Sequence, residues 1–104
     1  MTETPAALLL HPNDNIWIAC RDITKGETII VNELVVLMQN DIPVGHKIAF
    51  KNLRAGVKIT RYGASIGSLT KNIEKGEHIH THNLKSDYLQ SHDRGAVGSD
   101  EGKL

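Results

Sequence analysis

The stretch Asp41-Ile42-Pro43-Val44-Gly45-His46-Lys47-Ile48 belongs to a short pattern, Asp/Asn-Ile/Leu-x-x-Gly-x-x-Ile, that occurs four times in the chain. The other copies are Asp22–Ile29, Asn52–Ile59 and Asn72–Ile79. In each copy, we expect a buried Ile or Leu, then a four-residue turn with Gly at positive φ, then a strand. The first two copies start 19 residues apart and the last two start 20 apart. This spacing predicts two similar halves that meet near residue 51.

The segments between these turns are short, apolar and rich in β-branched residues, which is typical of strands. Asn32-Glu33 separates two of them and predicts a hairpin. We expect a compact all-β domain of about seven short strands, with at most a turn or two of helix near Pro43 or in the tail. The expected strands are Ile16–Cys20, Ile29–Val31, Leu34–Met38, Lys47–Phe50, Lys58–Tyr62 and His78–His82.

The composition limits the class of protein. The chain has 104 residues, 12 basic and 12 acidic side chains, and a net charge of zero. Such a length allows one domain, and balanced charge argues against a nucleic-acid binder. Leu34–Met38 is the longest apolar run, far too short for a membrane span. No basic region precedes the apolar segment Ala6–Leu10, and the single Cys20 cannot form an internal disulfide, so we expect a cytoplasmic protein.

The chain changes character near its end. Residues 85–104 carry three Gly, three Ser and few apolar side chains, so they cannot bury enough surface to offset their ordering entropy. We therefore expect a folded domain over residues 1–84 and a flexible polar tail or linker over residues 85–104.

Three of the six histidines lie in one short stretch, His78-Ile79-His80-Thr81-His82. On a strand, alternate residues share a face, so the three imidazoles would point together. A rise of about 3.3 Å per residue places neighbouring ones about 6.6 Å apart and the outer two about 13 Å apart. With metal–nitrogen bonds of about 2.0 Å, at most two of them reach one ion. A third ligand would come from His46, His11 or an acidic residue of a partner; the alternative is a polar strand edge without metal.

Two further motifs carry candidate catalytic residues. His46 and Lys47 follow a glycine and could present a proton carrier and a cation to an anionic substrate. Arg61 could bind a carboxylate through two hydrogen bonds, and Tyr62 could donate one. The alternatives are a solvated strand start for the first pair, and a surface Arg61 with a core Tyr62 for the second. No nucleophile elbow, P-loop or dinucleotide fingerprint is present in the sequence.

Four segments, taken in order along residues 8–84, resemble the N-terminal domain of altronate and galactarate dehydratases. They are His11–Asn15, Ile42–Ala49, Ile59–Gly67 and Gly76–Leu84. That domain is of the SAF type, so the resemblance implies a β-clip fold: a small, pseudo-symmetric all-β unit. His46, Lys47, Arg61, Tyr62 and the three clustered histidines fall on matching motif positions.

The resemblance also implies a function. The chain would be the small subunit or N-terminal domain of a metal-dependent sugar-acid hydro-lyase, acting with a larger catalytic subunit or domain and inactive alone. The family implies a divalent iron, manganese or magnesium ion in the assembled enzyme, and abstraction of the proton α to a carboxylate. The implied partners are the larger catalytic part and a sugar acid, with no nucleic acid and no membrane. A homo-oligomer is left open.

Two alternatives stay open. The chain also resembles the small subunit of sulfolactate sulfo-lyase, which eliminates sulfite from a hydroxy acid. A protein of another class is the second alternative: a ligand- or metal-binding assembly module that takes no part in the chemistry.

Overall fold

The computed structural model describes residues 5–86, which form nine short strands and no helix. This confirms the all-β prediction, and no helix able to cross a membrane occurs among these residues. The predicted tail lies almost wholly outside the described residues, although Lys85 still belongs to a strand. The strands are β1 (Ala7–Leu8), β2 (Ile16–Ala19), β3 (Thr28–Val31), β4 (Leu34–Leu37), β5 (Lys47–Ala49), β6 (Lys58–Arg61), β7 (Ala64–Leu69), β8 (His78–Ile79) and β9 (Leu84–Lys85).

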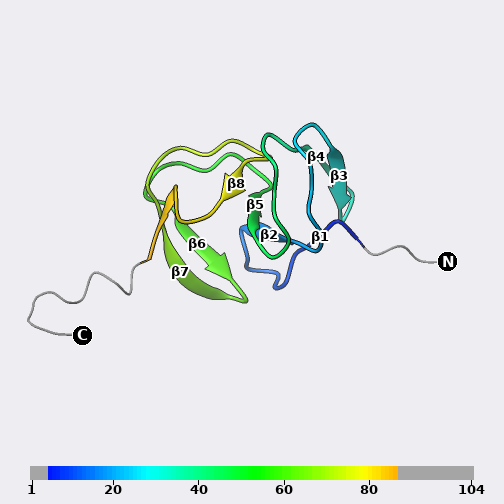
Figure 1. The fold of residues 1–104 in the computed structure, drawn as a ribbon. Coiled ribbons are helices and arrows are strands. Elements are labelled where there is room, and N and C mark those ends of the chain that lie inside the picture. Colours follow the sequence, from blue (N-terminus) through cyan, green and yellow to red (C-terminus); the bar gives the residue numbers. More distant parts are fainter. Residues whose placement is uncertain (1–4, 87–104) are drawn as a thin grey trace, which may run out of the picture.

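The strands form three antiparallel sheets. The central sheet has the order β1-β2-β5-β8, the β3–β4 hairpin forms the second, and β6-β7-β9 form the third. The β3–β4 and β6–β7 hairpins lie at opposite ends of the molecule, with β2, β5 and β8 between them (Figure 1). The central sheet therefore joins two outer β units.

The four sequence repeats form four equivalent turns. Gly26, Gly45, Gly56 and Gly76 have φ values of 94°, 84°, 89° and 93°, as the pattern predicts. In every turn the residue after the glycine donates its N–H to the carbonyl three positions earlier, at 3.0 to 3.1 Å. Each glycine N–H also bonds a carbonyl outside its own turn. The repeat is thus a structural unit of the fold.

The repeats associate in two pairs. The contacts of each pair are made by the first two residues of the pattern, Asp/Asn and Ile/Leu, which explains why these two residues are the same kind in all four repeats. Ile23 pairs with Ile42, and Leu53 with Ile73, each through two backbone hydrogen bonds of 2.7 to 2.8 Å. The Asp or Asn that starts a repeat accepts a hydrogen bond from a backbone N–H in the turn of the paired repeat. Both repeats of a pair make this contact. These acceptors are Asp22 for Val44, Asp41 for Lys25, Asn52 for Lys75 and Asn72 for Ala55. The pairing confirms two pseudo-symmetric halves.

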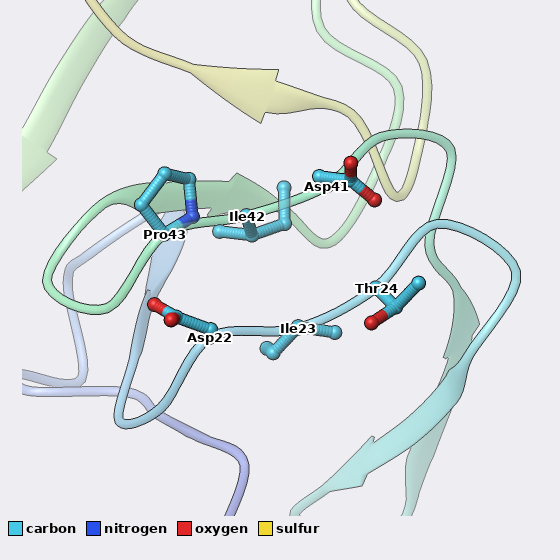
Figure 2. Close-up of a pocket in the computed structure, with 6 residues that line it drawn as sticks. All are labelled: Asp22, Ile23, Thr24, Asp41, Ile42 and Pro43. Atoms are coloured by element: carbon cyan, nitrogen blue, oxygen red, sulfur yellow. The ribbon is translucent and has the colours of Figure 1, made fainter.

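Each pair of repeats borders a surface pocket. The pocket of the first pair has a volume of about 330 Å³ and that of the second about 290 Å³. Figure 2 shows the first, in which Asp22–Thr24 and Asp41–Pro43 run side by side and Ile23 lies next to Ile42. At the first pocket, Asp22 and Asp41 each accept a backbone N–H from the paired turn, so these carboxylates stabilise the turn pairing.

Two apolar cores lie on either side of the central sheet. Strand β2 is buried along its whole length: Trp17 and Ala19 face the first core, and Ile16 and Ile18 face the second. Burial on both faces explains why this strand reads as a continuous apolar run rather than an alternating one. Trp17 also stacks on Phe50, with ring centroids 5.3 Å apart.

The two hairpins close through residues at positive φ. Asn32 and Glu33, with φ of 50° and 72°, form the predicted β3–β4 turn, and Tyr62 and Gly63 form a similar one between β6 and β7. The buried Asp14 holds this second turn, because its carboxylate accepts the N–H groups of Tyr62 and Gly63 at 2.9 and 2.8 Å. Asp14 therefore stabilises the β6–β7 turn.

The outer face of the β3–β4 hairpin is apolar and exposed. Ile30 and Val35 are cross-strand partners, and Thr28 pairs with Leu37 on the same face. Exposed fractions are 64% for Ile30, 52% for Val35 and 51% for Leu37. We call Thr28, Ile30, Val35 and Leu37 the outer hairpin face. Contiguous exposed apolar side chains of this kind are typical of contact surfaces.

Candidate functional site

The histidine stretch does not continue as a strand to His82. Strand β8 ends at Ile79, and residues 80–83 form a turn. The prediction of a strand over His78–His82 is therefore wrong in extent. The cause is Asn83, which is almost fully buried: its Oδ1 accepts the His80 N–H at 3.0 Å and its Nδ2 donates to the His78 carbonyl at 2.9 Å. These two bonds reverse the chain directly after Ile79.

The reversal brings the imidazoles closer together than a straight strand would. The ring centroids of His78 and His82 are 5.1 Å apart, and those of His78 and His80 are 5.8 Å apart. The expected separation of the outer two along an extended strand therefore does not apply. Ile79 points into the second core, as alternation requires, while His78 and His80 are half-buried on the other side.

The β5–β8 pairing adds His46 to this group. Ile48 pairs with His78 and Lys47 with Ile79, so the same antiparallel register places His46 opposite His80. Their rings stack with centroids 4.0 Å apart, and His46 Nδ1 lies 2.8 Å from His78 Nε2. One ligating nitrogen from each of His46, His78 and His80 falls within 4.8 Å of the others. We call these three residues the histidine face.

The backbone of the histidine face is fixed by turn contacts on each element. The His46 N–H donates to the Pro43 carbonyl at 3.1 Å, within the second repeat turn. The His78 N–H donates to Asn40 Oδ1 at 3.0 Å, and the His80 N–H to Asn83. Asn40 and Asn83 were not among the residues predicted from the sequence; their only signal is that Asn favours turns beside strands.

Two imidazoles of the histidine face, those of His78 and His46, have lowered pKa values. Burial, followed by the charges of His46 and the other neighbouring imidazoles, lowers the pKa of His78 to about 4. Burial, together with the charges of His80 and Lys47, also lowers the pKa of His46. A hydrogen bond between two rings requires one of them to accept, which fits neutral imidazoles. With its pKa lowered to about 4, His78 is a weak base at pH 7.

The other predicted catalytic candidates lie on β5, on β6 and in the turn after β6. They are Lys47, Arg61 and Tyr62. Lys47 is half-buried, and by strand alternation it lies on the opposite face of β5 from His46. Burial, and then the charge of Arg61, lowers the pKa of the Lys47 ammonium, so the two cations are near each other. Tyr62 lies in the β6–β7 turn with 69% of its surface exposed. The structure thus brings His46 to the clustered histidines but leaves Tyr62 at an exposed turn.

The remaining histidine of the N-terminal segment has a local role. His11 Nδ1 accepts the Asn13 N–H at 3.0 Å, and its ring lies against Gly63. Of the ligands considered for completing a histidine site, His46 is therefore the one that joins the cluster. Metal binding at any of these residues stays a prediction.

Comparisons with known proteins agree with this architecture. The sequence family described as altronate/galactarate dehydratase SAF domain matches residues 5–87. An altronate dehydratase of Bacillus subtilis (strain 168) is 40% identical over 77 residues, which are 74% of this chain and 16% of that protein. An altronate dehydratase of Escherichia coli (strain K12) is 31% identical over the same shares of each chain. Subunit alpha of a (2R)-sulfolactate sulfo-lyase of Paracoccus pantotrophus is 48% identical over 46 residues, 44% of this chain and 69% of that subunit.

Proposed function

Because the chain belongs to the altronate/galactarate dehydratase SAF domain family, we propose that it is the small subunit or N-terminal domain of a sugar-acid hydro-lyase. The observation that carries the proposal is the coverage. The match takes in 74% of this chain but only 16% of the altronate dehydratase of Bacillus subtilis. The chain therefore corresponds to a small part of such an enzyme. We propose that a larger catalytic part acts beside it, in the cytoplasm.

The outer hairpin face supports this partnership. A single small domain that leaves Ile30, Val35 and Leu37 half or more exposed has an apolar surface available for contact. We assign the outer hairpin face as the contact surface for the larger catalytic part, because the altronate dehydratases are several times longer than the segment that this domain matches. In the assembled enzyme these side chains would be removed from water.

The proposed chemistry is elimination β to a carboxylate. A divalent iron, manganese or magnesium ion in the assembled enzyme would stabilise the enolate-like charge formed when the α-proton leaves. From this chain, Lys47 and Arg61 supply neighbouring cations for a carboxylate of the sugar acid. The histidine face supplies imidazoles, and Tyr62 supplies the hydroxyl of an exposed side chain.

Domain replacement in the Bacillus subtilis altronate dehydratase tests the proposal. Its matched segment is exchanged for residues 1–86 of this chain, and dehydration of altronate and of galactarate is measured. The same enzyme with its own segment restored is the control. We expect turnover by the chimera and none by the chain alone. A folded chimera that dehydrates neither sugar acid would overturn the proposal.

A sulfo-lyase subunit is a second candidate, favoured by one observation. The matched subunit alpha of the sulfolactate sulfo-lyase is a short chain, 69% of which this sequence covers. Adding this chain to the Paracoccus pantotrophus sulfo-lyase lacking subunit alpha, and measuring sulfite release from sulfolactate, tests it. Sulfite release with an inactive altronate chimera would select this candidate over the dehydratase. If the chain binds either larger partner without changing its turnover, it is an assembly module.

A further inference from the structure

Three imidazoles, one from β8 and two from the turns next to β5 and β8, meet on the histidine face. His46 comes from the turn before β5, His78 from β8, and His80 from the turn after β8, and their ligating nitrogens lie within 4.8 Å of one another. All three side chains are half-buried, so the face is neither sealed in a core nor spread over open surface. The three backbone N–H groups are each bonded, which holds their Cα positions in place before anything binds.

The donor set fits a metal ion. In a tetrahedral site with metal–nitrogen bonds of about 2.0 Å, two ligating nitrogens lie about 3.3 Å apart. His46 Nδ1 and His78 Nε2 are now 2.8 Å apart and joined by one proton. When that proton moves to the other nitrogen of its own ring, the change of tautomer leaves a lone pair on each of the two facing nitrogens. The His80 ring stacks on His46 at 4.0 Å and needs only side-chain rotation to direct its own lone pair there.

The ligand type narrows the class of ion. The group within 4.8 Å contains only imidazoles and no carboxylate among the described residues. Imidazole nitrogen favours zinc, cobalt, nickel, copper and ferrous iron, whereas magnesium and calcium require oxygen ligands. A magnesium ion, one of the ions implied by the family resemblance, is therefore a poor match for this face. Three protein ligands also leave a position open, as in metal sites that bind substrate.

We propose that His46, His78 and His80 bind one divalent transition-metal ion on this domain. We do not include His82 in the site, because it lies outside the group of ligating nitrogens within 4.8 Å of one another, although its ring centroid is 5.1 Å from that of His78. Of the three histidines in the sequence motif, this ligand set contains His78 and His80. Its third member is His46, which lies 32 positions before His78 in the chain. The site deepens the proposed function, since it would give the lyase an ion with an open position for a hydroxyl or carboxylate oxygen of the sugar acid. Metal binding itself does not depend on that function.

The test uses the full chain and no activity assay. Zinc and cobalt(II) are titrated calorimetrically into the metal-free chain near neutral pH, and the cobalt complex is recorded in the visible region. We expect one ion per chain and an intense visible band typical of low coordination number. His46→Gln, His78→Gln and His80→Gln should each weaken binding by more than about tenfold, the loss found when merely an outer-shell partner is removed.

Two histidine variants serve as matched controls. His11→Asn retains an acceptor for the Asn13 N–H, and His82→Gln removes the neighbouring imidazole; both should bind one ion as the unmodified chain does. Fluorescence of the single, buried Trp17 verifies that every variant is folded. The proposal is wrong if the folded chain binds neither ion in a one-to-one ratio. It is also wrong if His46→Gln binds normally, if His82→Gln abolishes binding, or if magnesium binds as tightly as zinc.

These outcomes are independent of the domain replacement. A chain that binds no metal but restores dehydration refutes this site and leaves the proposed function intact. A chain that binds zinc through the three histidines but restores no activity supports this site and refutes the proposed function.

Discussion

Replacement of Gly76 by Ala should destabilise the chain much more than the same replacement at Gly26. The two glycines are equivalent in the repeat and have almost the same backbone conformation, with φ of 93° and 94°. They differ in surroundings. A Cβ at Gly26 would meet nothing within 4 Å, whereas one at Gly76 would overlap the backbone carbonyl oxygen of Leu37 and press on Gln39.

The expected magnitudes follow from this difference. An L side chain in the left-handed region costs about 1–2 kcal/mol, and this cost applies to both variants. Forcing an added methyl into packed surroundings costs about 1–3 kcal/mol more, and it applies to Gly76→Ala alone. The clashing atom belongs to backbone, so no side-chain rotation relieves it. Relief would also strain the bonds from Gly76 N–H to the Ala49 carbonyl and from Gln39 N–H to the Gly76 carbonyl.

Urea unfolding followed by Trp17 fluorescence measures both variants. Trp17 is the only tryptophan and is buried, so its emission reports loss of the first core. We expect Gly76→Ala to lower the free energy of unfolding by about 1–3 kcal/mol more than Gly26→Ala. Equal losses would refute the close approach of the fourth repeat to β4. Because Gly76 lies two residues before His78, the variant should also weaken metal binding.

Three further predictions concern the site and the contact surface. Asn83→Ala removes two hydrogen bonds to the backbone of His78 and His80 and should lower the free energy of unfolding by about 2 kcal/mol. Urea unfolding measures this loss. A loss below about 0.5 kcal/mol would show that Asn83 does not stabilise the turn. In the metal-free chain, the pKa of His78 is depressed to about 4 from 6.5, so its contribution to stability is complete above pH 6.5 and is lost as the pH falls toward 4. Urea unfolding across this range should show the decline, and His78→Ala should flatten it; an unchanged pH profile would contradict the shift. Ile30→Lys with Val35→Glu places opposite charges on a cross-strand pair of the exposed outer hairpin face. This double variant should leave the unfolding free energy within about 0.5 kcal/mol of its original value while weakening association with the dehydratase body in a pull-down titration. Unchanged association would exclude this face as the contact.

Local signals in the sequence were sufficient for the turns. The Gly positions, the Asn32-Glu33 hairpin and the apolar run at β2 depend on short-range conformational preference and burial, and the structure has all three. The very short strands β1 and β9 escaped prediction, since two residues carry no periodicity. Strand β7 was also missed, because Ala64–Leu69 contains a glycine and two serines.

The histidine face could not be predicted from any local pattern in the sequence. The His78-x-His80-x-His82 spacing indicated an extended strand, but the buried Asn83 turns the chain after Ile79. His46 was a candidate third ligand without a known position. Only the pairing register of β5 with β8, a contact between distant segments, places it opposite His80.

Turnover of histidine variants in the active chimera tests most directly whether this domain contributes to the lyase's chemistry. The chimera is prepared with His46→Ala, His78→Ala and His80→Ala separately, with His11→Asn as the control, and kcat and KM for altronate are measured. The account predicts that each of the three lowers kcat by more than about tenfold, while His11→Asn does not. Unchanged kcat in all three would contradict the account and leave the domain with a role in assembly alone.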